Sequence, residues 1–504
     1  MKLIIVFISL ISLILFVFTI PTLATSPSNI TIDYTKSIRS VTPLQFGMDE
    51  STYGSPSVLI NDLLQRNELK KLQVGYMRIT LIYQTPGDPT SGIICAASGC
   101  PKTYTADQWV NAVKSIGAEP IIEISDYLNP TSATDAANLV KHFNKDTNNY
   151  VKTWLIGNEP DLHSVDGTTY SNAFNSIYDA IKAVDPTIKI GGPATAWYDD
   201  TFIQTFLNIS GNRTDFVDFH AYDRQSLTAD VDLGTEAPLF ETHINSVRQK
   251  IQATVPARSS QIDIHIGEWN LKSTAILSEE TILNTVWGTS VIGHILNAGG
   301  FGLQYADKGG LGGALYSTAI NGQNIDDPLP IYHATGMFTG ESLFQHFGTI
   351  LVNSSTTLTN IEVFSSDNPK NIVVVNKDPS NSQQGIFSFI GGLSAGAIDV
   401  WREDQTTNPS NPPVKVGTIQ FSNSSFTYSL PPYSVTTFVI SSPASTPSLI
   451  PGDANSDGKV DGIDYIVWLI HFGQTTTNGY KDGDFDNDGK VDNLDYTIWF
   501  NNRN

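Results

Sequence analysis

Short apolar runs rich in β-branched residues alternate with amphipathic helical stretches from about residue 41 to about residue 310. Each run ends in polar or glycine-rich residues, which is typical of repeated βα units around a parallel sheet. The eight strand candidates are residues 44–48, 76–81, 120–124, 153–156, 189–192, 216–222, 262–266 and 301–305. Eight such strands within about 260 residues predict an α/β fold of the (β/α)8 TIM-barrel type.

Two of the helices between these strands are clear from their spacing. Residues 170–184 carry one apolar stripe and stop at Asp185-Pro186, where proline disfavours a longer helix. Residues 279–296 form the second, with the acidic first turn expected at a helix start. We expect both helices to be structural.

The pattern changes after Gly322 to strands without helices. The clearest strands are residues 371–376, 385–390, 398–402 and 433–440. Turn residues separate them, so we predict a β-sandwich over residues 323–440, behind a barrel domain over residues 25–322. An early strand at residues 30–36 is a candidate to join the sandwich. Residues 441–452 form a linker rich in Pro, Ser and Thr.

An internal repeat follows the linker, because the twelve residues from Asp453 to Asp464 recur 31 residues later from Asp484 to Asp495. A twelve-residue calcium loop needs oxygen ligands at positions one, three, five, nine and twelve, a carbonyl at seven and glycine at six. The predicted calcium ligands are Asp453, Asn455, Asp457, Lys459, Asp461 and Asp464, and Asp484, Asp486, Asp488, Lys490, Asp492 and Asp495. The repetition favours two structural calcium sites over a solvated acidic turn.

The N-terminal end indicates export. Residues 3–20 are almost entirely apolar, and the small-residue site Thr22-Leu23-Ala24 follows, so residues 1–24 are expected to be a signal peptide. An uncleaved anchor is the alternative, because the run nearly spans a bilayer. We expect a secreted protein with no stable membrane span once the signal is cleaved. In that setting Cys95 and Cys100 can form a small disulfide loop.

Composition and net charge limit the kinds of molecule that this protein is expected to bind. Of the 504 residues, 40% are hydrophobic and 16% charged, so most of the chain should fold. The 29 basic and 50 acidic residues give a net charge of −21, which repels phosphate backbones and excludes nucleic acid as an expected partner. Residues 453–504 contain ten Asp, three Lys and one Arg, so −6 of this charge lies in the calcium repeats.

Two motifs place a glutamate at the end of a predicted barrel strand. Asn158-Glu159-Pro160 follows the fourth strand, and Gly267-Glu268-Trp269-Asn270 follows the seventh. The C-terminal ends of barrel strands carry catalytic groups, and glycoside cleavage needs one carboxylic acid and one carboxylate. Taken singly, Asn-Glu-Pro is also a helix start and Glu268 a solvated carboxylate. Together they favour a glycosidase.

These motifs resemble those of glycoside hydrolase clan A, and their amino-acid sequences are most similar to those of families 39, 51 and 79. The resemblance implies a retaining glycosidase, with Glu159 as acid/base and Glu268 as nucleophile. It further implies that Asn158 donates to the sugar 2-hydroxyl and that Arg78 and Tyr222 support the nucleophile. A catalytic cofactor is not expected.

Three further residues are candidates for contact with a sugar. The period of two in Asp218-Phe219-His220-Ala221-Tyr222 turns His220 toward the mouth beside Tyr222. Trp197 follows the fifth strand and offers a stacking surface, although loop packing explains it as well. Tyr305 stands where the clan often has Trp at the end of strand eight.

The calcium repeats resemble a type I dockerin, over about residues 453–504. Asp at position twelve and a helix after each loop fit this module, which implies a cohesin-type scaffold partner. Gly462-Ile463 and Asn493-Leu494 replace the usual Ser/Thr recognition pair, so calcium binding is better supported than cohesin binding.

Three rival functions were weighed. A noncatalytic carbohydrate-binding protein, docked through its calcium module, keeps the same architecture, but intact Glu159 and Glu268 argue against it. A metal-dependent hydrolase lacks ligands, since the nine His show no HxH or HxxxH spacing. A serine hydrolase needs a G-x-S-x-G turn between a strand and a helix, whereas the G-x-S-x-G spacing at residues 392–396 lies between two predicted strands.

Overall fold

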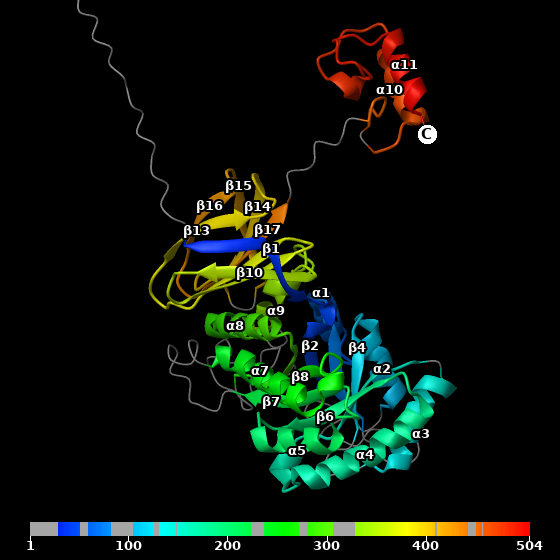
Figure 1. Ribbon diagram of the computed structural model, residues 1–504. Helices are drawn as coiled ribbons and strands as arrows, with labels where there is room; N and C mark the ends of the chain where they lie inside the picture. Colours follow the sequence, from blue (N-terminus) through cyan, green and yellow to red (C-terminus); the bar gives the residue numbers. More distant parts are fainter. Residues whose placement is uncertain are drawn as a thin grey trace, which may run out of the picture.

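The computed structural model describes most of the chain as a barrel, a β-sheet domain and a small C-terminal helical unit (Figure 1). The described residues are 29–50, 59–81, 104–124, 131–147, 149–222, 236–271, 281–305, 328–408, 411–441, 450–455 and 457–503. The proposed signal peptide, Cys95 and Cys100, and most of the linker lie outside these ranges. None of the helices in these ranges is long and apolar enough to span a membrane.

Eight parallel strands close into a barrel, in chain order from β2 to β9, with β2 hydrogen-bonded to β9. They are β2 (Phe46–Glu50), β3 (Tyr76–Thr80), β4 (Glu119–Ile124), β5 (Thr153–Ile156), β6 (Lys189–Thr195), β7 (Phe216–Tyr222), β8 (Asp263–Asn270) and β9 (Phe301–Tyr305). The predicted (β/α)8 barrel is thus confirmed. Apolar side chains such as Tyr76, Leu155 and Phe216 fill its interior.

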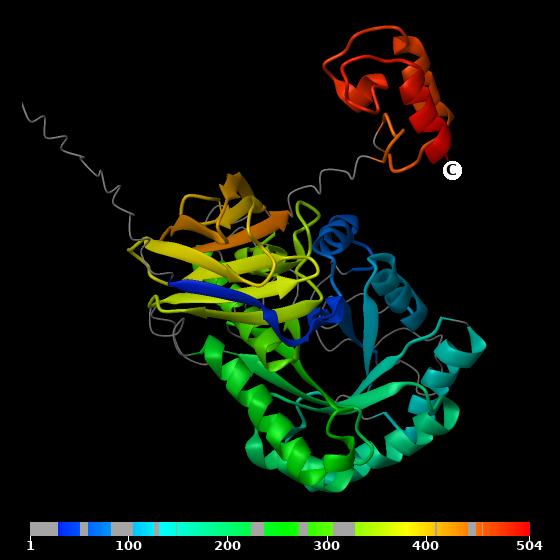
Figure 2. The same ribbon diagram turned by 45° about the horizontal axis from the view of Figure 1, so that its top comes forward.

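Helices cover the outside of the barrel (Figure 2). They are α1 (Leu63–Leu72), α2 (Ala106–Ser115), α3 (Ala133–Lys141), α4 (Gly167–Val184), α5 (Asp200–Ser210), α7 (Ala237–Thr254) and α8 (Ile282–Ala298). Short helical turns are η1 (Pro43–Gln45), η2 (His142–Asp146), η3 (Pro160–His163) and η4 (Pro256–Arg258). Helix α8 begins after Thr281, so its first turn contains no acidic residue, contrary to the prediction.

The second domain is a sheet of nine described strands. Eight of them come after the barrel in the sequence, and the first comes from before it. The strands are β1 (Ile30–Ser40), β10 (Ile350–Thr356), β11 (Ile361–Asp367), β12 (Asn371–Asn376), β13 (Gln383–Ile390), β14 (Gly396–Glu403), β15 (Val414–Phe421), β16 (Ser425–Leu430) and β17 (Ser434–Ser441). Strand β1 pairs with β10 and β13, so the early strand does join this domain.

The sheet folds over on itself around a single apolar core. Its strand order is β15-β14-β17-β12-β11-β10-β1-β13-β16. Four strands separate β17 from β13 in this order, yet the rings of Phe438 and Phe387 lie 5.1 Å apart between their centroids. This folding supports the predicted sandwich.

One expectation about this region is wrong. Residues 323–440 were expected to contain strands without helices, but α9 (Pro330–Thr339) lies within them, and every one of its ten residues is buried. Helix α9 packs on α8 of the barrel on one side and contacts β17 on the other. Because both faces of α9 are covered, its sequence shows no polar stripe, and the helical period is hidden.

The barrel and the sandwich share a continuous contact through α8 and α9 (Figure 1). Val373, Val375 and Val435 of the sandwich belong to the same apolar cluster as the barrel core. Gly293 of α8 lies so close to the ring of Phe364 that a Cβ there would collide with it. The two domains therefore pack as one unit.

The C-terminal unit consists of α10 (Gly462–His471), the turn η7 (Gly479–Asp482) and α11 (Asn493–Asn502). Asp461 and Asp492 cap the two helices through their side chains. Trp468 donates to the carbonyl of Asp492, and Trp499 donates to that of Asp461, both at 2.9 Å. The two repeats therefore brace each other symmetrically.

Candidate active site

Glu159 and Glu268 both lie at the C-terminal mouth of the barrel. Glu159 comes three residues after the end of β5, and Glu268 lies near the end of β8. The backbone of Glu159 is left-handed, with φ 48°, and its N–H donates to the carbonyl of Ala194 at 2.8 Å. Such a conformation is strained for a residue with a side chain and is typical of functional sites.

The two carboxylates approach each other around His220 of β7. One donor atom from each of the three side chains lies within 4.8 Å of the other two. His220 Nδ1 is 3.0 Å from Glu159 Oε1 and 3.5 Å from Glu268 Oε2. The barrel thus brings together side chains from three strands that are far apart in sequence.

Arg78 of β3 is the central cation of this site, and its side chain is only 2% exposed. Its Nη1 donates to Glu268 Oε1 at 2.8 Å, and its Nη2 donates to Asn158 Oδ1 at 2.7 Å. The same guanidinium donates to the carboxylate of Glu123. This planar group fixes Glu268 and Asn158 at once, as a lysine would not.

Glu268 has a second hydrogen bond, from the Tyr222 hydroxyl to Oε2 at 2.6 Å. Burial alone would raise the pKa of Glu268, but the charges of His220 and Arg78 and these hydrogen bonds lower it below its ordinary value of 4.5. Glu268 is therefore ionised at neutral pH.

His220 lies between the two glutamates, and its Nε2 is 3.2 Å from Arg78 Nη1. Burial lowers its pKa, whereas the charge of Glu268 and the hydrogen bond with Glu159 raise it, with a net value of about 9. Burial also raises the pKa of Asp218, whose Oδ1 lies 4.0 Å from His220 Nε2, to about 7.

Three acidic residues of this site were missed at the sequence level: Asp49, Glu123 and Asp218. All three are buried, and Asp49 Oδ1 lies 3.5 Å from Arg78 Nε. The available signal was an acidic residue within an apolar barrel strand, as in Pro120-Ile121-Ile122-Glu123-Ile124. A buried carboxylate needs a partner, so each such residue points toward a cation inside the barrel.

The aromatic candidates lie at the edge of this cluster. Trp197, His220 and Tyr222 help to line a pocket of about 260 Å³ together with Tyr198, His243 and Glu236. Tyr305, at the end of β9, places its ring 6.5 Å from that of Tyr222, between centroids. The structure therefore places Arg78, Asn158 and His220 against the carboxylates, and Trp197 and Tyr305 at the margin.

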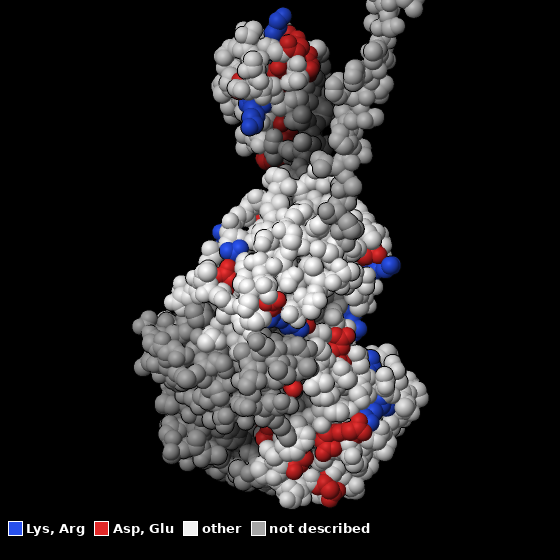
Figure 3. All heavy atoms as spheres, turned by 90° about the vertical axis from the view of Figure 1, so that its left-hand side faces the viewer, with Lys and Arg blue, Asp and Glu red and all other residues white. Residues whose placement is uncertain are grey.

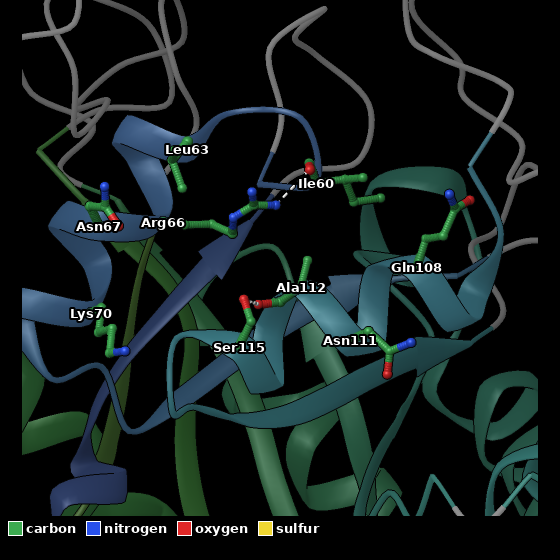
Figure 4. A pocket seen from close by; sticks show the side chains of 9 residues that line it. All are labelled: Ile60, Leu63, Arg66, Asn67, Lys70, Gln108, Asn111, Ala112 and Ser115. Atoms are coloured by element: carbon green, nitrogen blue, oxygen red, sulfur yellow. Dashed lines mark hydrogen bonds between the residues drawn. The ribbon is translucent and has the colours of Figure 1, made fainter.

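A larger pocket of about 480 Å³ lies elsewhere, between α1 and α2 on the outside of the barrel (Figure 4). Arg66, Lys70, Gln108 and Asn111 are among its lining residues, and Arg66 donates to the Ile60 carbonyl at 2.6 Å. None of the described residues that line this pocket is a carboxylate, and the pocket does not include Glu159 or Glu268.

The calcium repeats have matching local structure. In the first loop Gly458 N donates to Asp453 at 2.9 Å, and in the second Gly489 N donates to Asp484 at 2.9 Å. Gly458 and Gly489 have φ 86° and 88°, which glycine adopts without strain. Carboxylate oxygens of Asp484, Asp486 and Asp495 lie within 4.8 Å of one another. Such an all-oxygen donor set fits a hard cation.

On the face in Figure 3, acidic side chains are scattered over the described part of the barrel, and the neighbouring sandwich is mostly uncharged.

Comparisons with known proteins agree with this geometry. Residues 134–298 match the family model described as Glycosyl hydrolases family 39, a segment that contains Glu159 and Glu268 but not Arg78. A β-xylosidase from Geobacillus stearothermophilus is 28% identical over 168 residues, which cover 30% of this chain and 32% of that protein. The chain thus matches about a third of the length of this curated relative.

Solved structures share the barrel and the sheet domain. The α-L-arabinofuranosidase from Thermotoga maritima superimposes with a TM-score of 0.64 at 17% identity, over 82% of this chain and 100% of that one. A family 44 endoglucanase from Clostridium thermocellum superimposes with a TM-score of 0.62 at 15% identity, over 82% and 99%. At such identities the likeness concerns the fold alone, which this chain shares with these two enzymes.

Proposed function

We propose that this protein is a secreted glycoside hydrolase that cleaves O-glycosidic bonds of a polysaccharide or oligosaccharide with retention of configuration. The observation that carries the proposal is the approach of Glu159 and Glu268, with oxygens within 4.8 Å of each other at the barrel mouth. Retaining enzymes hold their carboxyl groups about 5–5.5 Å apart, whereas inverting enzymes need about 6.5–9.5 Å to admit a water.

Glu268 is assigned as the nucleophile, because it is ionised and held at both oxygens. Its carboxylate attacks the anomeric carbon while the bond to the leaving oxygen breaks, and Glu159 gives its proton to that oxygen. In the second step Glu159 takes a proton from water, which attacks the same carbon and releases Glu268. His220 orients Glu159 through its 3.0 Å hydrogen bond.

Asn158 is assigned to the sugar 2-hydroxyl. Its Oδ1 accepts from Arg78, which fixes the amide so that the Nδ2 group is the one turned to donate. A hydrogen bond that strengthens as the oxocarbenium ion develops lowers the barrier. Trp197 lines the adjoining pocket, where its ring can stack on a sugar face.

The experiment is to replace each glutamate by alanine and assay aryl β-xylosides, arabinofuranosides, glucuronides and glucosides. Removal of an acid/base or a nucleophile should lower turnover about 100- to 10,000-fold or more. Azide should rescue Glu268→Ala with inversion and Glu159→Ala with retention. The control is Glu119→Ala, an exposed glutamate at the start of β4, which should keep full activity.

Two outcomes oppose this assignment. Unchanged turnover in both variants would favour the noncatalytic carbohydrate-binding alternative. Trapping with a 2-fluoro glycoside should label Glu268, and a label on another residue would refute its role.

The C-terminal repeats support a second proposal, in which two calcium ions order residues 453–503 and the unit docks onto a cohesin-type scaffold. Its helices carry several large apolar residues that are each 44–61% exposed. They are Ile463, Ile466, Leu469, Ile470, Leu494 and Phe500. Exposed apolar patches of this kind mark protein interaction sites. Binding to immobilised cohesin modules in calcium but not in EDTA tests the docking; no binding in calcium would reject it.

A further inference from the structure

Three side chains of types that can bind a metal meet where the barrel contacts the sandwich, away from the glutamate pair. His333 lies on α9, Glu341 in the turn after it, and Glu403 at the end of β14. One donor atom from each lies within 4.8 Å of the other two, and the side chains are 1%, 5% and 1% exposed. Helix α9 lies against the sandwich in Figure 1, so the cluster joins both domains.

An unusual backbone conformation positions the Glu341 side chain next to His333. Glu341 and the next residue, Ser342, have φ 46° and 61°, two successive left-handed residues that carry side chains. Such conformations are strained for residues with side chains and persist where the surroundings fix them. A Cβ at Gly336 would collide with the Glu341 carboxylate, so glycine there leaves the space that this group occupies.

The cluster is short of positive charge. Within the described part of the chain, His333 is the only basic side chain within 4 Å of either carboxylate. Neither oxygen of Glu403 has a hydrogen-bond partner among the described residues. A buried carboxylate without a partner is costly, and a bound cation would remove that cost. A proton is the competing occupant, since burial raises the pKa of Glu403 to about 8.

We propose that His333, Glu341 and Glu403 bind one zinc ion that ties the barrel to the sandwich. His333 Nδ1 is 2.8 Å from Glu341 Oε1 and 3.8 Å from Glu403 Oε1. Neighbouring ligands of tetrahedral zinc stand about 3.3–3.4 Å apart, so small side-chain shifts complete the site. One imidazole with two carboxylates suits zinc better than calcium or magnesium, which prefer oxygen alone.

A route to the site is present. A pocket of about 410 Å³ is lined by His333 and Glu341, together with Glu68, Tyr332 and Pro412. It gives zinc a path from the surface and leaves room for a water as the fourth ligand. The proposal is independent of glycoside cleavage, because none of the three ligands belongs to the network around Glu159 and Glu268.

The test uses the untagged full chain, stripped with a chelator and then saturated with calcium so that the C-terminal loops are filled. Zinc is added at pH 7.5, and bound metal is measured by elemental analysis after dialysis and by calorimetry. We expect one zinc per chain and a rise of several degrees in the unfolding midpoint. Glu403→Gln and Glu341→Gln should each weaken zinc binding at least about 100-fold.

The matched control is Glu159→Gln, which removes a donor from the cluster of Glu159, His220 and Glu268 at the barrel mouth. It should keep its zinc; loss of zinc in this variant instead would overturn the proposal. Wild-type protein that binds no zinc at 10 μM, or that gains no stability from it, would also overturn it. X-ray absorption of the wild-type complex should show one imidazole and oxygen ligands, even if a variant fails to fold.

Discussion

The Tyr222 hydroxyl donates a 2.6 Å hydrogen bond to Oε2 of Glu268, across the neighbouring strands β7 and β8. Arg78 donates to the other oxygen, Oε1, at 2.8 Å. With both oxygens held, the carboxylate has one orientation toward an anomeric carbon in the mouth. The same two bonds favour its ionised form, so position and charge of this group are set by the same contacts.

Tyr222→Phe should therefore lower kcat on an aryl glycoside. A hydrogen bond to a charged group contributes about 1.5–3 kcal/mol, which corresponds to about a 10- to 150-fold loss. Steady-state kinetics measure it. Tyr150→Phe is the matched control, because that hydroxyl makes a 3.0 Å hydrogen bond with Thr187 on the barrel surface. Equal activity of both variants would contradict the supporting role of Tyr222.

The pH profile gives a separate test of the same bond. The pKa of Glu268 lies below its ordinary value of 4.5 in the folded protein, so this carboxylate should stay ionised above pH 4.5 and take up a proton at a lower pH. The acid limb of kcat/KM should thus lie below pH 4.5 in the wild type. Loss of the Tyr222 hydroxyl raises this pKa, so the limb of Tyr222→Phe should move to higher pH. A limb that stays in place would separate Tyr222 from the ionisation of Glu268.

Arg78→Lys should strongly lower both the stability and the activity of the protein, although it keeps the positive charge. The guanidinium contacts Glu123, Asn158 and Glu268 at once, and a lysine cannot reproduce this fork. Breaking a buried ion pair costs about 3–5 kcal/mol, so urea unfolding should show a clearly lower midpoint together with low kcat. Arg213→Lys is the control, since Arg213 pairs with Asp179 at the exposed surface. A similar small effect in both would argue against the central place of Arg78.

The strands were well predicted where polar residues flank a short apolar run on both sides. Strands β5, β7 and β9 begin and end at the predicted residues, because each run is closed by turn or glycine-rich residues. Helix α9 was missed because burial on all sides removes the polar face that makes a helix visible in sequence.

Only part of the site was predicted, because some of its residues carry a local sequence signal and others do not. Glu159 lies three residues after β5 and Glu268 lies near the C-terminal end of β8, so strand order alone places them at the mouth. Asp49 and Glu123 lie within strands, and their partner Arg78 comes from another strand. Only closure of the barrel brings these charges together, so no local pattern could pair them.

Calcium removal should loosen the C-terminal unit selectively. Nine of the ten Asp of residues 453–504 are predicted ligands in the two loops, and their charges repel one another without a cation. Hydrogen exchange of α10 and α11 should therefore accelerate in EDTA, while exchange of the barrel strands stays unchanged. Equal protection with and without the chelator would reject calcium binding. Asp484→Asn and Asp453→Asn show whether each loop contributes.

The contact of His294 and Glu362 should make stability depend on pH at the barrel–sandwich interface. His294 of α8 lies 2.7 Å from Glu241 and 3.2 Å from Glu362, and Lys377 lies 2.5 Å from Glu362. Burial opposes both charges, but these partners raise the pKa of His294 to about 9 and lower that of Glu362 to about 2. The ion pair is therefore complete in the folded protein across neutral pH.

The sign of each contribution follows from the unfolded values of 6.5 and 4.5. The raised pKa of His294 stabilises the fold below pH 6.5, and this is lost as pH rises through 9. The lowered pKa of Glu362 stabilises it above pH 4.5, and this is lost as pH falls through 2. The interface should be most stable between about pH 4.5 and 6.5.

Glu362→Gln should lower the thermal unfolding midpoint by about 3–6 °C at pH 5.5, with a smaller gap to the wild type at pH 3 and at pH 9.5. Calorimetry at the three pH values measures it. The control is Asp399→Asn, which removes an exposed pair with Lys415 and should change the midpoint little at any pH. A gap that is constant with pH would mean that packing of the Glu362 side chain, rather than its charge, stabilises this interface.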